Sequence, residues 1–393
     1  MNNTKYKQTE VGLIPSDWDV KTLGEVGEVK MCRRIFNNET SSNGSIPFFK
    51  IGTFGREPDA YISKEQYDDY RKRFSFPRKG DILISAAGTI GRTIIYNGED
   101  AYFQDSNIVW IENDFKTLSN EFLYHIYQVA NYNTEGGTIQ RLYNSILKAT
   151  KFKCPTKAEQ TAIATALSDA DALISGLEKL IAKKRNIKQG AMQKLLQPKE
   201  GWEVKTLGEI AEMYSGGTPL TSIPSYYNGN IPWVVIADIT KAGKYISETE
   251  KTISQEGVSN SSAKLFKKGV LLFAMYASIG KTTIALMDTT CNQAILGIEP
   301  KLIDKEYLYY YLSFKERHFI TMGQTGTQSN LSKDMVQKLE IPIPKSKEEQ
   351  IQIATILSDM DAEITALETK LEKYKRVKLG MMQNLLIGKI RLV

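Results

Sequence analysis

The residues of this sequence that could carry chemistry are few, and the most suggestive is the run Gly280-Lys281-Thr282. Such a run ends the phosphate-binding loop of nucleotide-hydrolysing proteins, which also needs a glycine five positions earlier so that the backbone can curl around phosphate. Met275 occupies that position. In the first half of the chain, Arg92 follows Gly91 in the same way that Lys281 follows Gly280, so an arginine replaces the lysine. We therefore expect no ATP site, but a glycine turn after a strand that presents one cation, Arg92 or Lys281.

Other catalytic and metal-binding patterns do not occur in the sequence. The two histidines, His125 and His318, lie on aromatic-rich segments at positions that do not correspond, so we expect them to serve packing. Cys32, Cys154 and Cys291 are far apart and odd in number, which argues against a disulfide framework or a zinc knuckle. Neither a Gly-x-Ser-x-Gly elbow nor the Asn- or Asp-Pro-Pro-aromatic run of an adenine methyltransferase is found. The sequence predicts no catalytic residue, metal site or cofactor in this chain.

What remains is a set of polar side chains suited to contact with nucleic acid. Arg and Lys neutralise phosphates or pair with guanine, and Gln and Asn suit adenine. A net charge of +6 permits such binding without demanding it. The candidates in the first half are Arg33, Arg34, Arg56, Arg71, Lys72, Arg73, Arg92, Gln140 and Arg141. Those in the second half are Thr218, Tyr226, Lys241, Lys244, Lys281, Gln324, Gln328 and Asn330.

The elements that must position these candidates come in two copies. Residues 18–25 return at 202–209, and the pair Glu159-Gln160 returns as Glu349-Gln350. Two similar but non-identical surfaces on one chain, related by approximate symmetry, suit a two-part partner.

Each copy is expected to begin with a globular part that mixes helices and strands. Short apolar runs indicate buried strands at 82–85 and 108–111, and again at 270–274 and 294–298. Shorter helices are expected at 120–130 and at 305–320. Asp304 is the expected cap of the second of these helices.

One long helix follows each globular part. Thr156-x-x-Glu159 and Ser346-x-x-Glu349 fit capping boxes, and Pro198 and Gly388 lie near the far ends. Apolar residues then step alternately by four and three, which is the seam of a coiled coil. The seam residues are Ile163, Leu167, Ala170, Ile174, Leu177, Ile181, Ile353, Leu357, Met360, Ile364, Leu367 and Leu371.

We expect the two seams to face each other, so that the helices run antiparallel about a pseudo-two-fold axis. The alternative is that each helix packs against its own globular part. About 35 residues at about 1.5 Å each would make a strut of roughly 50 Å, or about one to two turns of DNA. Such a strut could act as a ruler.

Four features together resemble the specificity subunit of type I restriction–modification enzymes, and they cover essentially the whole chain. They are Gly12-Leu13-Ile14-Pro15-x-x-Trp18; Gly216-Gly217-Thr218-Pro219 leading to Ile231-Pro232-Trp233; Gly323-x-x-x-Thr327-Gln328-x-Asn330-Leu331-Ser332 running into Ile341-Pro342-Ile343-Pro344 and Glu349-Gln350; and Leu385-Leu386-x-Gly388-Lys389-Ile390-Arg391-Leu392. Their order and spacing are more specific than any single motif.

The resemblance implies an α+β architecture with two target-recognition domains, at 1–155 and 201–345. It implies two conserved helical regions, at 156–200 and 346–393, that pair as an antiparallel coiled coil. Each recognition domain would recognise one half of a bipartite, asymmetric double-stranded DNA target. The helices would set the spacer and dock methyltransferase subunits.

The resemblance also implies a chain without catalysis of its own. Two methyltransferase subunits would use S-adenosylmethionine to methylate adenine N6, and motor-nuclease subunits would use ATP with Mg²⁺. The first domain has Cys32-Arg33-Arg34-Ile35 where the second has Gly216-Gly217-Thr218-Pro219, as expected if the two halves recognise different half-sites.

Two other functions stay open on the sequence: a nucleotide-hydrolysing enzyme built around Lys281, and a coiled-coil scaffold that does not touch DNA. No apolar run approaches the length of a membrane span, and the polar start is no secretory signal. We therefore expect a cytoplasmic protein.

Overall fold

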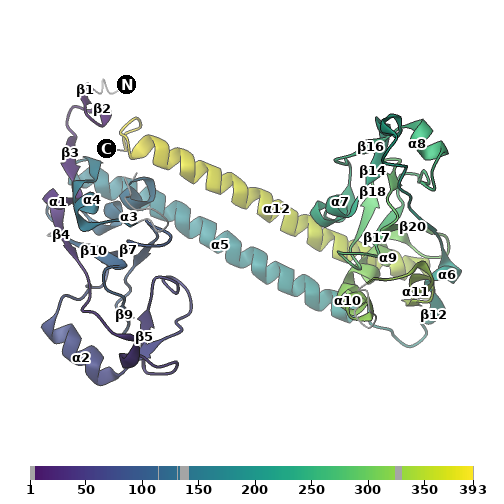
Figure 1. The fold of residues 1–393 in the computed structure, drawn as a ribbon, viewed down its shortest axis with the longest axis horizontal. Coiled ribbons are helices and arrows are strands. Elements are labelled where there is room, and N and C mark those ends of the chain that lie inside the picture. The colour runs from purple at the N-terminus through teal and green to yellow at the C-terminus, as the bar shows by residue number, and fades with distance from the viewer. Residues whose placement is uncertain (1–4, 114, 131, 133–140, 324–329, 393) are drawn as a thin grey trace. The chain divides into compact units, whose positions relative to one another are not determined.

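The computed structural model describes residues 5–113, 115–130, 132, 141–323 and 330–392. The chain divides into two compact units. Unit 1 comprises Met1–Glu178 and Thr369–Val393, and unit 2 comprises Lys179–Glu368. Each unit combines one globular part with stretches of the two long helices (Figure 1).

The core of unit 1 is a four-stranded antiparallel sheet in the order β4-β10-β7-β8. A smaller sheet has the order β6-β5-β9. The strands are β4 (Gly27–Lys30), β5 (Ile46–Phe49), β6 (Tyr61–Ile62), β7 (Ile82–Ser85), β8 (Thr93–Ile95), β9 (Tyr102–Phe103) and β10 (Ile108–Asn113). Successive residues of β7 enter two different hydrophobic clusters: Ile82 and Ile84 join one, and Leu83 joins the other. Burial on both faces explains why the run is apolar throughout instead of alternating.

Unit 2 repeats this plan with a five-stranded sheet in the order β13-β20-β17-β18-β15. Its smaller sheet has the order β16-β14-β19. The strands are β13 (Ala211–Ser215), β14 (Tyr227–Val234), β15 (Tyr245–Ile246), β16 (Thr252–Ile253), β17 (Leu271–Ala274), β18 (Thr282–Ala285), β19 (Thr290–Cys291) and β20 (Ile295–Pro300). Leu271 and Phe273 of β17 enter one cluster and Leu272 enters the other, so this sheet is also buried on both faces.

Shorter elements complete the two globular parts. The strands are β1 (Tyr6–Thr9), paired with β2 (Gly12–Pro15); β3 (Asp19–Thr22), paired with β11 (Lys151–Cys154); and β12 (Glu203–Thr206), paired with β21 (Glu340–Ile343). The helices are α1 (Leu23–Val26), α2 (Lys64–Arg73), α3 (Asn120–Val129), α4 (Asn144–Ala149), α6 (Leu207–Ile210), α7 (Ile236–Lys241), α8 (Gln255–Ser259), α9 (Lys305–Phe314), α10 (Glu316–Gly323) and α11 (Lys333–Gln337), with 3-10 turns η1 (Asn37–Glu39) and η2 (Pro224–Tyr226). The predicted strands are present. The single helix expected at 305–320 is divided at Lys315 into α9 and α10, and the Asp304 side chain caps α9 as predicted.

The long helices are α5 (Lys157–Leu195) and α12 (Lys347–Leu385), and each passes from one unit into the other. In unit 1, Asp171 and Glu178 of α5 pair with Lys378 and Lys375 of α12. In unit 2, Lys184 and Lys188 of α5 pair with Glu363 and Asp361 of α12. Rising numbers on one helix meet falling numbers on the other, so the helices are antiparallel in both units.

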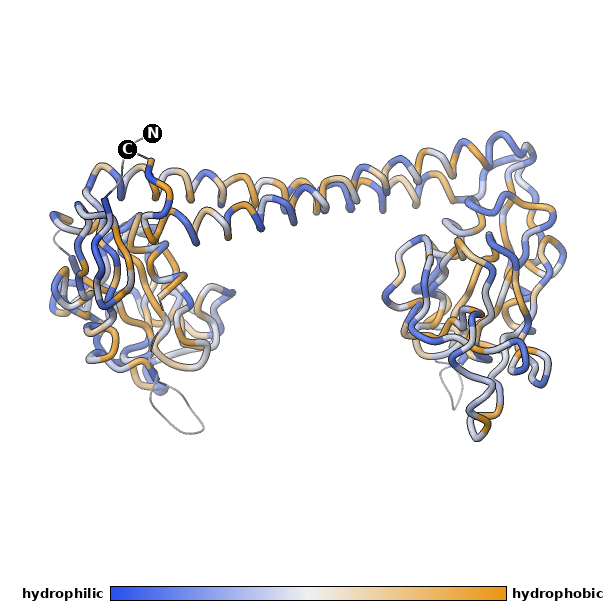
Figure 2. Tube along the Cα trace, turned by 90° about the horizontal axis from the view of Figure 1, so that it is seen from above, coloured by the Kyte–Doolittle hydropathy of each residue, from blue (hydrophilic) through white to orange (hydrophobic). Residues whose placement is uncertain are grey.

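All of the predicted seam residues are buried or half-buried, and apolar and polar residues alternate along both helices (Figure 2). Ile163 and Leu167 belong to the core of unit 1 together with Met382 and Leu385 from the end of α12. Ile353 and Leu357 occupy the corresponding place in unit 2. The first turns of each helix therefore pack on the globular part that precedes them, as the alternative had it, and also against the other helix.

The predicted capping boxes are only half right. The Thr156 and Ser346 hydroxyls accept hydrogen bonds from the backbone N–H groups of Glu159 and Glu349, at 3.4 Å and 3.0 Å. The Glu159 carboxylate, however, is completely buried and accepts from the indole N–H of Trp18 at 2.7 Å. It also pairs with Arg391 near the C-terminus. Its partners come from both ends of the chain, so the local motif could not have predicted them.

Arg391 connects the last residues of the chain to the first ones in unit 1. Its guanidinium reaches Asp17 at 2.7 Å as well as Glu159, and it holds the pKa of Asp17 below its usual value. The Tyr6 hydroxyl donates to the Gly388 carbonyl at 3.2 Å. The end of α12 is thereby fixed to the globular part of unit 1.

Candidate nucleic-acid interface

Three loops meet at one end of the main sheet in unit 1, which we call the loop end of unit 1. They are residues 31–36 after β4, 86–92 between β7 and β8, and 104–107 before β10. They adjoin because Ser85 ends β7 opposite Ile108, where β10 begins. The N–H of Ala86 donates to the Asn107 carbonyl at 2.7 Å, which ties two of the loops together.

The loop end of unit 2 is built in the same way. Its loops are residues 216–223 after β13, 275–281 between β17 and β18, and 292–294 before β20. Ala274 ends β17 opposite Ile295, and the Met275 N–H donates to the Ala294 carbonyl at 2.9 Å. Both units therefore bring three separate stretches of chain to one edge.

The middle loop of each loop end is the predicted glycine turn. Gly91 and Gly280 both have φ +84°, and their N–H groups donate to carbonyls at the ends of the preceding strands, Ser85 and Ala274. In unit 2 the turn leads into strand β18, whereas a phosphate-binding loop leads into a helix and keeps its N–H groups free for phosphate. The nucleotide-hydrolysing alternative is therefore not supported.

The cations of the two turns have different surroundings. Arg92 is half-buried and donates to the Phe54 carbonyl at 2.9 Å, so it braces the loop that contains Arg56. Across the part of the chain that the structure describes, the Lys281 ammonium has no hydrogen bond or ion pair. Lys281 is therefore the cation of the two that is available to a ligand.

The first loop of each loop end is held by an equivalent hydrogen bond from an aromatic side chain to a backbone carbonyl, which we call the shared frame. The Arg33 carbonyl accepts from the Tyr102 hydroxyl at 3.0 Å, and the Gly217 carbonyl accepts from the Trp233 indole at 3.1 Å. Arg33 aligns with Gly217 in the same sequence register that aligns Trp18 with Trp202. An aromatic side chain of the smaller sheet thus supports one equivalent carbonyl in both units.

The same frame presents different polar pairs. In unit 1 the exposed Arg34 guanidinium binds Asp105 at 2.8 Å. In unit 2 the Thr218 hydroxyl hydrogen-bonds the Gln293 side chain. Asp105 and Gln293 both lie in the loop that precedes the long inner strand of their sheet. A charged pair in one unit thus corresponds to a neutral pair in the other.

The glycines of the Gly216-Gly217-Thr218-Pro219 motif are required by close packing. A Cβ atom on Gly216 would lie 2.2 Å from the Asn292 carbonyl oxygen, and one on Gly217 would lie 2.3 Å from the Ala263 backbone nitrogen. Unit 1 has larger residues at these positions. The two glycines are therefore required for packing in unit 2, and Thr218 is the residue of the motif whose side chain remains exposed.

The other candidates differ in exposure, and some lie outside the described residues. Exposed ones in unit 1 are Arg33, Arg56, Arg71, Lys72, Arg73 and Arg141, and Asn330 of unit 2 is half-buried. Arg33 and Arg73 both lie over the Phe74 ring, with centroid distances of 5.3 Å and 5.2 Å. Gln140, Gln324 and Gln328 lie outside the described residues.

Lys244 and Tyr226 are not free surface groups. The Lys244 side chain is 9% exposed, pairs with Glu306, and donates to the Tyr310 hydroxyl and to Ser358 of α12, both at 3.1 Å. This lysine fastens the loop before β15 to α9 and α12. Tyr226 is buried, and we leave both residues out of the interface.

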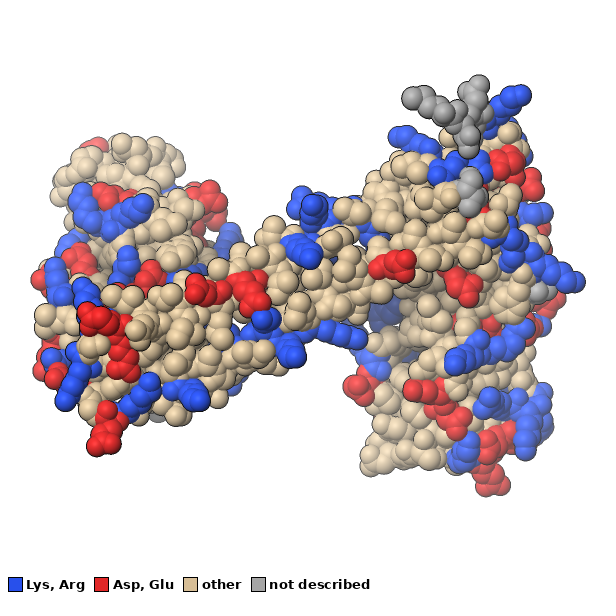
Figure 3. Space-filling view, turned by 180° about the vertical axis from the view of Figure 1, so that it is seen from behind, with Lys and Arg blue, Asp and Glu red and all other residues tan. Residues whose placement is uncertain are grey.

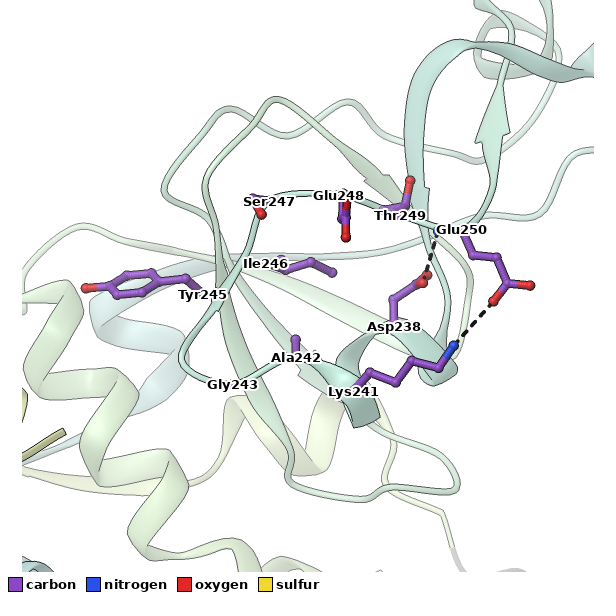
Figure 4. A pocket seen from close by; sticks show the side chains of 10 residues that line it. All are labelled: Asp238, Lys241, Ala242, Gly243, Tyr245, Ile246, Ser247, Glu248, Thr249 and Glu250. Carbon is purple, nitrogen blue, oxygen red and sulfur yellow. Dashed lines mark hydrogen bonds and ion pairs between the residues drawn. The ribbon is translucent and has the colours of Figure 1, made fainter. Parts of the chain in front are cut away.

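Lys241 points into an open hollow of about 690 Å³ that α7 and the following loop line (Figure 4). Its ammonium lies 3.6 Å from a Glu250 carboxylate oxygen. The buried Asp238 carboxylate accepts from the backbone N–H groups of Val235 and Glu250, at 2.8 Å and 3.2 Å. These contacts give Asp238 a structural role, and the Glu250 carboxylate partly neutralises Lys241.

Charge on the face shown in Figure 3 is mixed, with Lys and Arg interspersed among Asp and Glu. Within the described ranges, no group of three or more His, Cys, Asp or Glu side chains could hold a metal ion. No helix among the described residues is long and apolar enough to cross a membrane. His125 is fully buried, as its predicted packing role requires, and burial lowers its pKa to about 4. His318 is instead exposed.

A family model for the type I restriction modification DNA specificity domain matches the chain twice, at residues 15–189 and 199–375. The chain belongs to this family. Each matched range covers most of one globular part and most of the long helix that follows it, which is the internal repeat seen in the sequence.

Similar specificity proteins come from distant organisms. A putative type I restriction enzyme specificity subunit of Haemophilus influenzae is 55% identical over 156 residues, which are 39% of this chain and 40% of that protein. A specificity subunit of Methanocaldococcus jannaschii is 35% identical over 191 residues, 48% of this chain and 44% of that protein. These two alignments thus span less than half of each relative. A putative specificity subunit of M. jannaschii aligns over 98% of this chain and 96% of its own length at 24% identity.

Two solved structures share the fold of this specificity-domain chain. The S subunit of a type I restriction-modification system from M. genitalium has a TM-score of 0.62 at 18% identity, covering 98% of this chain and 97% of that one. A chain from a structure of assembly and conformational transition in a type I system has a TM-score of 0.60 at 16% identity, with 96% and 99% covered.

Sequence reasoning missed four residues of the two loop ends. Asp105 and Gln293 are the partners of Arg34 and Thr218, and Phe36 and Leu220 are exposed beside them. The register that aligns Trp18 with Trp202 also aligns Phe36 with Leu220, and this signal could have identified that pair.

Proposed function

We propose that this chain is the DNA-recognising specificity subunit of a type I restriction–modification system and has no catalysis of its own. Each loop end recognises one half of a bipartite double-stranded target. The observation that carries this proposal is one frame with two chemistries: Arg34 with Asp105 in unit 1, and Thr218 with Gln293 in unit 2. A shared frame with different polar groups is what two different half-sites require.

Phosphate contacts and base contacts come from different residues in this proposal. Lys281 and the basic end of α2, residues 71–73, neutralise phosphates and orient each unit on the duplex. The Arg34 guanidinium donates to guanine, and Asp105 accepts from the amino group of cytosine. Thr218 and Gln293 suit an adenine-containing pair.

Partner subunits supply the chemistry. We propose that two methyltransferase subunits, which use S-adenosylmethionine to methylate adenine N6, dock along the long helices. Support comes from Leu173, Leu180 and Ile187, which recur on α5 at one heptad spacing and are exposed. Motor-nuclease subunits that use ATP with Mg²⁺ complete the system.

The helices set the gap between the half-sites. Their antiparallel pairing within each unit leaves little freedom for the globular part to shift along the helices. We place the protein in the cytoplasm, which suits its three free and buried cysteines.

Methylome sequencing tests the proposal. DNA from cells that carry this chain and its methyltransferase is compared with DNA from cells that lack the chain. The expected result is an interrupted motif with methylated adenines that disappears on deletion. In vitro, the chain with its methyltransferase should prefer that motif over a scrambled duplex, whereas equal binding would favour the scaffold alternative.

A further inference from the structure

Each loop end exposes one large apolar side chain at the same place. Phe36 is 60% exposed in unit 1, and Leu220 is 63% exposed in unit 2. They align with each other in the register that relates Trp18 to Trp202. Phe36 lies two residues after Arg34, and Leu220 lies two residues after Thr218. Both units thus expose a large apolar side chain at one equivalent position.

Both side chains stand on a firmly held backbone. The preceding residues, Ile35 and Pro219, are buried. The Phe36 N–H donates to the Glu39 carboxylate at 2.6 Å, and the Tyr227 hydroxyl donates to the Pro219 carbonyl at 2.6 Å. The chain thus holds each apolar group in water at a fixed position. A ligand with an apolar group of its own would remove that surface from water.

We infer that Phe36 and Leu220 each contact the C5-methyl group of a thymine in the major groove and so determine specificity within their half-sites. This inference rests on the proposed function. Thymine is the base that offers an apolar group in the grooves of DNA, and the major groove is where its methyl group is displayed.

The neighbouring polar groups favour the major groove. Asp105 can accept from the cytosine amino group there, and Gln293 can pair with adenine there. The minor groove of an A·T pair presents only acceptors, which would repel the Asp105 carboxylate. Insertion of Phe36 or Leu220 as a wedge between base pairs in the minor groove is the competing geometry, and the experiment below separates the two.

The spacing between the two exposed residues of each loop predicts which base pair contains the contacted thymine. Residues 34 and 36, like 218 and 220, are exposed on either side of a buried residue, so both members of each pair face the same side of the loop. An extended chain advances about 3.3 Å per residue, close to the roughly 3.4 Å between bases on one strand. The contacted thymine should therefore lie within about two base pairs of the base recognised by Arg34 or Thr218.

The test uses the intact chain with its methyltransferase subunits and a duplex carrying the methylated motif. Each thymine is replaced singly by uracil, which lacks the methyl group, and binding is measured by equilibrium competition. One replacement in each half-site should weaken binding about fourfold, the loss expected when one methyl group has no apolar contact. F36A should remove this discrimination in one half-site, and L220A in the other. F36L should keep it.

Matched controls stand at the opposite ends of the same sheets. Phe115 is 45% exposed just after β10, and Leu302 is 66% exposed just after β20. F115A and L302A should leave every uracil effect unchanged. All four alanine variants replace exposed side chains and should keep the urea midpoint of the parent.

Three results would overturn the inference: no uracil replacement changes binding, discrimination persists in F36A and L220A, or a half-site has no thymine. A rise in 2-aminopurine fluorescence on binding, without a uracil effect, would show a wedge instead. Equal binding of the unmodified chain to the motif and to a scrambled duplex would instead refute the proposed function itself. That outcome is distinct from the three results that concern Phe36 and Leu220.

Discussion

The Lys378 ammonium lies 2.6 Å from the Asp171 carboxylate where α12 passes α5 in unit 1. Lys188 and Asp361 make the corresponding contact in unit 2. Asp171 is equivalent to Asp361, and Lys188 to Lys378, in the register that repeats Glu159 as Glu349. The two repeats therefore exchange one pair of contacts reciprocally, which is how an isologous interface between two separate copies is built.

Breaking the Lys378 pair should weaken unit 1. The Lys378 side chain is 15% exposed and that of Asp171 is 35% exposed, so K378M should lower the free energy of unfolding by about 1–2 kcal/mol, between the values for exposed and buried ion pairs. The exposed pair Lys375–Glu178 on the same helices is the control, and K375M should lower the free energy of unfolding by less than K378M does. Urea unfolding of both variants, with D171N for a double-mutant cycle, measures the coupling. Equal effects of K378M and K375M would contradict the prediction.

His125 occupies the position in α3 that Tyr310 occupies in α9 of unit 2. The Tyr310 hydroxyl donates to an Asp361 carboxylate oxygen at 2.8 Å. In unit 1, within the residues that the structure describes, one oxygen of Asp171 and the Nδ1 atom of His125 are buried without a hydrogen-bond partner. H125Y supplies the missing donor and should raise the free energy of unfolding at pH 7 by about 1 kcal/mol.

The same variant should change the pH dependence of stability. Burial lowers the pKa of His125 to about 4 in the folded protein, below the ordinary value of about 6.5. The unfolded chain therefore binds the proton first, and stability is lost as pH falls from about 6.5 to about 4, by at most about 1.4 kcal/mol per pH unit. H125Y should flatten this slope in urea titrations, whereas H318Y, at the exposed histidine, should leave it unchanged.

Lys281 should act on DNA and not on nucleotide. Its turn offers no free N–H groups at Gly280 or Lys281 for phosphate, so K281A should leave calorimetric titrations with Mg·ATP unchanged. Loss of one phosphate contact should weaken DNA binding and reduce the slope of log K against log salt by about 0.9. Lys267, exposed at the other end of the sheet, provides the control K267A, which should keep the parental slope. An unchanged slope for K281A would remove Lys281 from the interface.

Lengthening both helices should lengthen the DNA spacer. Four residues inserted after Glu178 in α5, with four inserted before Lys375 in α12, add about 6 Å at about 1.5 Å per residue. That length corresponds to about two base pairs, so the methylated motif should gain about two base pairs between unchanged half-sites. Methylome sequencing reads the result directly. A constant gap would mean that the helices do not set the spacing.

The sequence by itself determined the repeat, the main strands and both long helices. These features follow from local signals: the period of apolar residues, and the caps that Thr156 and Ser346 provide. It also carried the family resemblance, because motif order is a property of the chain. Candidates such as the exposed Arg34 and the half-buried Lys281 could be recognised in the sequence as basic residues of polar segments.

Only the tertiary structure decided which candidates share a surface. Lys244 has the same charge as Lys281 but is buried against α9 and α12. Glu159 fits a capping box but instead binds Trp18 and Arg391, from the two ends of the chain. Phe36 looks like a core residue by type, yet it is exposed. Burial and ion pairing are set by neighbours distant in sequence, and a local pattern has no information about them.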